Sequence, residues 1–320
     1  MGPFRLLCLL AISLSSLLCG ARAAPLRVVS FHSVLAEFAT RIGGSEVEVL
    51  CLIPAGTDPH SFSPAPADVR VIARAELLLA NGFELEPYLE KLVRNSGTQA
   101  SLYEASTAIR ERVVSCAAGE SPHAAEPKAG AHAHEHAYEH AHEHGEFDPH
   151  WWHSVRAASD VAGGICAQLS ALCPAAAPAM QQRLAELRAE LAQLERWCLQ
   201  TLEKLPPARR QLVTSHDAFG YLARDFGFSI HPLNGVNPDS EADARSLARL
   251  IDFVSKNKIH AIFPDNTENP RVLAAMTRET GARLGGTLYA DGLGEPGGPA
   301  ATYQAMYRHN LAAIVVGLAD

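Results

Sequence analysis

One long amphipathic segment in the middle of the chain sets the strongest limit on its fold. From about Pro178 to Leu205 leucines recur at helical spacing, and Pro206 follows as a helix breaker. The apolar stripe consists of Leu184, Leu187, Leu191 and Leu194. At about 1.5 Å per residue the predicted helix is roughly 40 Å long. This length suits a rigid strut between two lobes better than a crossover helix inside one lobe.

Short strand patterns alternate with helical patterns on both sides of this strut. Before it, the strand candidates are Leu26–Ser30, Glu46–Ile53, Glu76–Ala80 and Ala100–Glu104, and the helix candidates are His32–Ile42, Ala65–Ala73, Glu86–Val93 and Ser154–Leu172. After it, the strand candidates are Gln211–Ser215, Ser229–Leu233, Ile259–Pro264 and Gly286–Ala290, and the helix candidates are Asp217–Asp225, Ser240–Lys256, Asn269–Thr280 and Ala300–Leu318. The alternation predicts an α/β fold with mainly parallel sheets. We expect an N-terminal lobe over residues 24–177, a linking helix over 178–205 and a C-terminal lobe over 206–320.

The first 23 residues have the pattern of a secretory signal peptide. Arg5 precedes an apolar run from Leu6 to Leu18, and a small-x-small cleavage site ends at Ala23. We therefore expect cleavage after Ala23 and a soluble periplasmic protein. Two alternatives are an N-terminal membrane anchor, which no stop-transfer pattern supports, and a lipoprotein attached through Cys19, where the preceding Leu18 is too bulky.

The net charge limits the kinds of partner that the protein can bind, and the spacing of the cysteines limits which disulfides can form. The formal charge of −8 argues against a nucleic-acid partner, and we expect a monomer. Beyond the leader the cysteines are Cys51, Cys116, Cys166, Cys173 and Cys198. Cys166 and Cys173 lie seven residues apart on one predicted helix, about 10 Å, which is too far for a disulfide. The pair expected to bridge is Cys51 with Cys116.

A histidine-rich run points to transition-metal chemistry. It contains His132, His134, His136, His140, His142 and His144, interleaved with glutamates. Imidazole and carboxylate suit zinc, copper or nickel. The surrounding stretch, residues 117–145, has no apolar periodicity and is expected to be a mobile insertion. It either captures zinc weakly or is a solvated spacer; its match to the His-x-x-Glu-His metalloprotease signature at residues 136–140 is expected by chance in such a repeat.

Four further motifs follow predicted strands or open helices. They contain His60 in Asp58-Pro59-His60, His150 in Asp148-Pro149-His150, His216 in Ser215-His216-Asp217, and Asp291 in Ala290-Asp291-Gly292. Because ligands bind outside the carboxyl ends of strands in α/β sheets, two motifs from each lobe should converge on one cleft between the lobes.

These motifs, in this order, resemble the metal-binding receptors of ATP-binding-cassette importers for zinc and manganese. Six motifs carry the resemblance: Asp58-Pro59-His60-Ser61-Phe62, Asn81-Gly82-x-x-x-Glu86, Asp148-Pro149-His150-x-Trp152, His216 to Tyr221, Gly235 to Glu241, and Asp291-x-Leu293-Gly294. It covers essentially the whole chain after the leader. It implies two α/β lobes joined by one rigid helix, no enzymatic activity, and an inner-membrane ABC permease as partner.

The resemblance also implies the ligands. His60, His150, His216 and Asp291 would form a tetrahedral site, which suits Zn²⁺, whereas manganese-type members have a glutamate in place of His216. His153 and Asp217 are candidates for supporting positions, and His153 could also be a direct ligand because it lies one helical turn from His150. The function expected is zinc delivery to the permease, with a zinc-donor chaperone as a further candidate partner. The alternatives are a periplasmic zinc buffer or chaperone not tied to import, and a zinc hydrolase.

Overall fold

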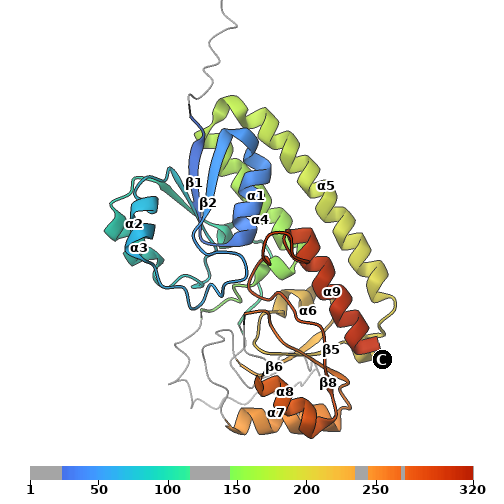
Figure 1. The fold of residues 1–320 in the computed structure, drawn as a ribbon. Helices are drawn as coiled ribbons and strands as arrows, with labels where there is room; N and C mark the ends of the chain where they lie inside the picture. Colours follow the sequence, from blue (N-terminus) through green and yellow to red (C-terminus); the bar gives the residue numbers. More distant parts are fainter. Residues whose placement is uncertain (1–23, 116–144, 235–243, 268–270, 320) are drawn as a thin grey trace, which may run out of the picture.

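The computed structural model describes residues 24–115, 145–234, 244–267 and 271–319. The predicted signal peptide, the six histidines of the run at 132–144, Cys116 and the element from Gly235 to Glu241 lie outside the described residues. Two four-stranded parallel sheets form two lobes, and a long helix joins them (Figure 1).

The N-terminal sheet has the strand order β2-β1-β3-β4. Its elements are β1 (Leu26–Ser30), α1 (Ser33–Gly43), β2 (Val47–Cys51), α2 (Pro66–Ile72), β3 (Leu77–Ala80), α3 (Leu89–Ser96) and β4 (Ser101–Glu104). Side chains alternate between its two faces, as a pleated strand requires. Leu77 and Leu79 face the core beneath α1, whereas Leu78 packs with Leu89 and Leu92 of α3 on the opposite face.

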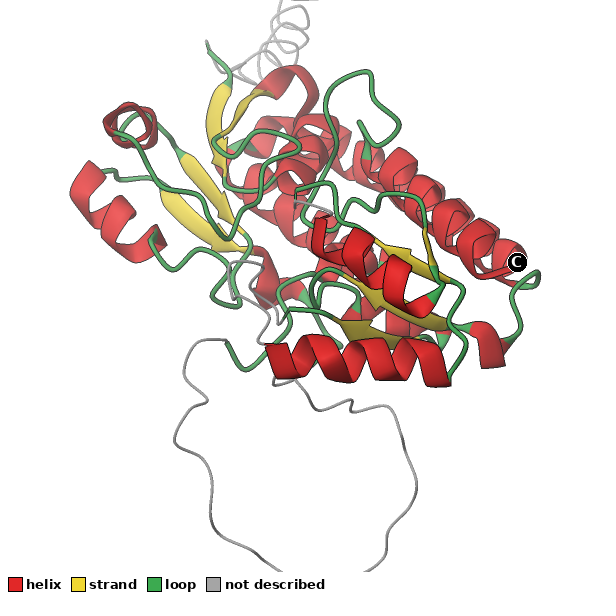
Figure 2. Ribbon diagram, turned by 60° about the horizontal axis from the view of Figure 1, so that its bottom comes forward, coloured by secondary structure: helices red, strands yellow, loops and turns green. Residues whose placement is uncertain are grey.

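The C-terminal sheet repeats this plan with the order β6-β5-β7-β8. Its elements are β5 (Gln211–Thr214), α6 (Gly220–Phe226), β6 (Ser229–Pro232), α7 (Ala244–Lys256), β7 (Ala261–Phe263), α8 (Arg271–Thr280), β8 (Arg283–Leu284) and α9 (Tyr303–Ala319). Figure 2 shows its strands with helices on both sides. The expected strand Gly286–Ala290 is wrong. The strand ends at Leu284, and Leu288 keeps a single bridge to Asp265. Gly285 N–H still bonds the carbonyl oxygen of Ile262, but the next donor of the ladder would be Pro264, which has no N–H.

Helices α4 (Val155–Leu172) and α5 (Ala177–Leu202) form a hairpin along the N-terminal lobe, and α5 continues beside α9 (Figure 1). The predicted strut is therefore confirmed, with its leucine stripe buried. One apolar cluster includes residues of α1, α4, α5, α6 and α9 and so runs through both lobes. Among the described helices, none is both long and apolar enough to cross a bilayer.

Candidate metal centre

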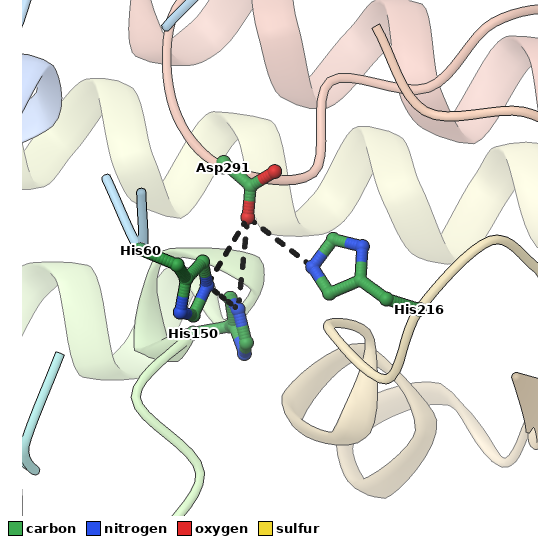
Figure 3. Close-up of side chains that lie close together, drawn as sticks. All are labelled: His60, His150, His216 and Asp291. Carbon is green, nitrogen blue, oxygen red and sulfur yellow. Dashed lines mark hydrogen bonds and ion pairs between the residues drawn. The ribbon is translucent and has the colours of Figure 1, made fainter. Parts of the chain in front are cut away.

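Four side chains from four separate segments meet between the lobes (Figure 3). His60 follows β2, His150 precedes α4, His216 follows β5, and Asp291 lies between β8 and α9. One ligand atom from each lies within 4.8 Å of the others. The structure thus brings together all four residues that the motifs singled out.

The distances between these atoms match the space around one small cation. His60 Nε2 lies 3.2 Å from His150 Nε2, and His216 Nε2 lies 3.2 Å from Asp291 Oδ1. Asp291 Oδ1 lies 3.6 Å from His60 Nε2 and 3.7 Å from His150 Nε2. Zinc bonds of about 2.0–2.1 Å at tetrahedral angles place neighbouring ligand atoms roughly 3.3 Å apart. The four side chains therefore fit a tetrahedrally bound ion with little rearrangement.

The centre is buried, and His60 is its side nearest to solvent. The side chains of His150, His216 and Asp291 are 0% exposed and that of His60 is 8% exposed. His60 also lines a cavity of about 820 Å³ with Glu84, Glu90 and Glu104. Four protein ligands in a closed site leave no position for a catalytic water, which is the opposite of a hydrolytic zinc centre.

Carboxylates behind two of the histidines fix which ring nitrogen faces the centre. Asp148 Oδ1 lies 2.7 Å from His150 Nδ1, and Asp265 Oδ2 lies 2.6 Å from His216 Nδ1. In each pair Nδ1–H donates to the carboxylate, so Nε2 is left as a metal ligand. Such partners orient the ring and raise its basicity.

The carboxyl group of Asp291 is held so that one oxygen faces the histidines. Its Oδ2 accepts a hydrogen bond of 2.9 Å from the Thr267 hydroxyl. Its Oδ1 is buried and faces the ring nitrogens of His60, His150 and His216. Asp291 therefore presents one oxygen to a metal.

The charges of the groups at the centre determine what a metal must displace. Burial raises the pKa of a carboxyl, but His216 and His60 hold the pKa of Asp291 well below its usual range. Burial opposes charge on the His216 ring, yet Asp291 and Asp265 raise the pKa of His216 well above its usual range. A metal bound here must displace that proton, because metals bind the neutral imidazole. Burial lowers the pKa of His150 well below its usual range, so this ring is ready to bind.

The two candidate supporting residues occupy different surroundings. His153 Nε2 lies 2.8 Å from the carbonyl oxygen of Ala290, beside the centre and outside the group of four ligand atoms. Asp217 is half-buried next to His216, and the carboxylate that bonds the His216 ring is Asp265.

The sequence reasoning missed Asp265, Thr267 and His32 as neighbours of the centre. Asp265 could have been found as a carboxylate two residues after a strand, the same position that His216 has after β5. His32 Nε2 lies 3.2 Å from the carbonyl oxygen of Asp291. It opens an N-terminal helix and carries no local signal of that long-range contact.

Comparison with known proteins decides the class to which this centre belongs. The sequence profile of the family described as zinc-uptake complex component A periplasmic (ZnuA) matches residues 28–317. The chain belongs to this family. It is a metal-binding substrate-binding protein of an ABC transporter, and the family consists of solute receptors that work with a membrane permease, not of enzymes.

Relatives in the ZnuA family are named for binding different metals. The manganese-binding lipoprotein MntA of Bacillus subtilis is 28% identical over 92% of this chain and 90% of its own length. The zinc-binding protein TroA of Treponema pallidum is 29% identical over 91% of this chain and 88% of its own length. The solved periplasmic zinc-binding protein TroA superposes with a TM-score of 0.79 at 28% identity, covering 92% of this chain and 100% of that one. The relatives thus support metal binding but do not distinguish zinc from manganese. That choice depends on the ligands of the centre.

Proposed function

We propose that this chain is a periplasmic receptor that binds Zn²⁺ through His60, His150, His216 and Asp291 and delivers it to an ABC import permease. The observation that carries this proposal is the donor set, three imidazole nitrogens and one carboxylate oxygen within 4.8 Å of one another. Three nitrogens and one oxygen in a buried tetrahedral arrangement suit zinc.

Manganese is the second candidate, because relatives such as MntA are manganese-binding proteins. Manganese prefers more oxygen ligands. The hydrogen bond from Thr267 to Asp291 Oδ2 works against a bidentate carboxylate, which would be the nearest source of a further oxygen. This favours four-coordinate zinc over manganese.

Titration of the mature protein with each metal, followed by metal analysis, tests the proposal. A chain lacking residues 131–144 separates the proposed site from the histidine-rich run. We expect one tight zinc equivalent in both chains and at least about tenfold weaker zinc binding in His60→Ala, His150→Ala and His216→Ala. Unchanged affinity in all three variants, or tighter binding of manganese than of zinc, would contradict it.

Delivery to a permease distinguishes the receptor from a zinc buffer. We expect zinc-loaded protein to stimulate ATP hydrolysis by the permease complex in membrane vesicles. Mass spectrometry of the exported chain tests the leader, for which we propose a mature N-terminus at Ala24; a lipid-modified Cys19 would instead show a lipoprotein.

A further inference from the structure

The segment that carries Asp291 is attached to the opposite lobe. Residues 290–293 follow the C-terminal sheet in the chain, and Leu288 still bonds the backbone of Pro264 there. From Ala290 onward the backbone partners change. The carbonyl oxygen of Ala290 accepts hydrogen bonds from Trp152 Nε1 at 2.7 Å and from His153 Nε2 at 2.8 Å. Both donors belong to the N-terminal lobe, directly after His150.

His32 makes the corresponding contact to Asp291 itself. Its Nδ1 accepts a hydrogen bond from the backbone N–H of Val34 at 3.3 Å, so the ring proton lies on Nε2. That Nε2–H donates to the carbonyl oxygen of Asp291 at 3.2 Å. The ring is 1% exposed and stacks on Trp152 with ring centroids 4.2 Å apart. His32 therefore has one buried orientation, which serves both α1 and the Asp291 segment.

The next two residues continue the attachment. Leu293 N–H donates to the hydroxyl of Ser33 at 2.9 Å, and its carbonyl oxygen accepts from Gly56 N–H at 2.8 Å. Gly292 lies so close to α1 that a Cβ there would meet Ser33 Oγ at 2.6 Å. The segment thus lies against the start of α1 and against the loop that leads to His60.

His216 has a different support. Its ring bonds Asp265, and its carbonyl oxygen accepts a hydrogen bond from Thr214 at the end of β5. Asp265 N–H bonds the hydroxyl of Ser215. All of these groups lie at the ends of β5 and β7 or in the loops that follow them, within the C-terminal lobe.

We propose that His32 is a positioning residue for metal binding. With Trp152 and His153 it fixes residues 290–293 to the N-terminal lobe. Asp291, His60 and His150 then form one half of the site, and His216 is the ligand contributed by the other lobe. This inference rests on the proposed metal site. It follows that relative motion of the lobes separates His216 from the other three ligands and breaks the hydrogen bond from Thr267, which lies in the C-terminal lobe, to Asp291 Oδ2.

Two substitutions of His32 separate its two roles, which are to cap α1 and to hold the carbonyl oxygen of Asp291. In His32→Asn the side-chain oxygen can still accept from Val34 N–H and cap α1, but the side chain is too short to reach the Asp291 carbonyl. In His32→Gln the amide nitrogen can take the place of Nε2. The matched control is His309→Ala, because His309 lies half-buried on α9 and its ring lies 2.9 Å from the carbonyl oxygen of Thr287, four residues before Asp291.

Zinc affinity and release are measured by competition with a chelator. We expect about tenfold weaker binding and faster release in His32→Asn, as is typical when a group that orients a ligand is lost. Affinity should be largely restored in His32→Gln and unchanged in His309→Ala. Equal affinity of His32→Asn and the unchanged protein, or equal losses in the Asn and Gln variants, would overturn the inference.

Hydrogen exchange of metal-free protein gives a readout that does not depend on the proposed function. We expect faster exchange of peptides covering residues 290–293 in His32→Asn, with no change in peptides from β5. Failure of the unchanged protein to bind zinc would refute the proposed function, while exchange would still decide whether His32 holds the segment. Unchanged exchange in His32→Asn would refute the attachment even if zinc binds.

Discussion

Asp291 can offer a metal one oxygen because Thr267 occupies the other. The Thr267 hydroxyl bonds Oδ2, and Oδ1 faces the three histidine nitrogens. A single hydroxyl group therefore sets how many oxygen donors the centre provides. The rings of His150 and His216 are oriented in a similar way by Asp148 and Asp265. At the proposed site we therefore expect metal preference to depend also on residues that do not touch the metal.

Thr267→Val should shift metal preference toward manganese. Without the hydroxyl, both oxygens of Asp291 can turn toward the ion, which favours an ion that takes more oxygen ligands. We expect the ratio of manganese to zinc affinity to rise roughly tenfold, measured by competition titration. Thr277→Val is the control, because that hydroxyl bonds the backbone of Ala274 within α8. An unchanged ratio would show that Thr267 does not restrict the carboxylate.

Asp265→Asn should weaken zinc binding about 10- to 100-fold. The carboxylate that orients the His216 ring and raises its basicity becomes a neutral amide of the same shape. Isothermal titration compares this variant with Asp252→Asn, an exposed aspartate on α7. Equal affinities of the two variants would mean that His216 is oriented by other contacts.

Helix α5 connects the two lobes. It packs on α1 and α4 at one end and on α9 at the other. Its leucine stripe is buried along this length, whereas Leu199 on its outer face is 56% exposed. An amphipathic helix of this kind is stabilised chiefly by burial of its apolar face.

Leu187→Ala should lower the free energy of unfolding by about 2–5 kcal/mol, because Leu187 is 1% exposed and its truncation leaves a cavity in the core. Urea unfolding of the metal-free protein measures this change. The control Leu199→Ala, on the exposed face of the same helix, should change the unfolding free energy by no more than about 0.5 kcal/mol. Similar losses in both variants would indicate that helix propensity, and not packing, dominates.

The two lobes share one apolar core. The largest cluster includes Leu35 of α1, Leu191 of α5, Phe219 before α6 and Tyr307 of α9. Hydrogen bonds add to this continuity, since the Tyr303 and Tyr307 hydroxyls donate to the backbone of Trp152 and His153. The lobes should therefore unfold together.

In the chain lacking residues 131–144, zinc at about 100 times its dissociation constant should raise the unfolding free energy by about 2.7 kcal/mol, because the proposed site exists only in the folded chain. Calorimetry should show one cooperative thermal transition, and this transition should move to higher temperature when zinc is added. His216→Ala should show a much smaller shift. Two separate transitions, or an equal shift in His216→Ala, would contradict a shared core or the proposed site.

The alternation of strands and helices, the strut and the four candidate ligands could all be read from the sequence. Period-2 and period-3.6 patterns record which face of each element is buried, and that information is local. The leucines of α5 are an example. The candidate ligands stood out because each lies in a short motif beside a predicted element.

The contacts that organise the centre could not be read in this way. Asp265 meets His216 across 49 residues, and His32 meets Asp291 across 259 residues. Such pairs arise when separate elements pack, and no periodicity within either segment encodes them. The strand expected at 286–290 failed for the same reason, because its pairing depends on Pro264 of the neighbouring segment, which has no N–H to continue the ladder. Local sequence patterns thus determined the elements and marked candidate ligands, whereas packing between the lobes decided how Asp291 is held.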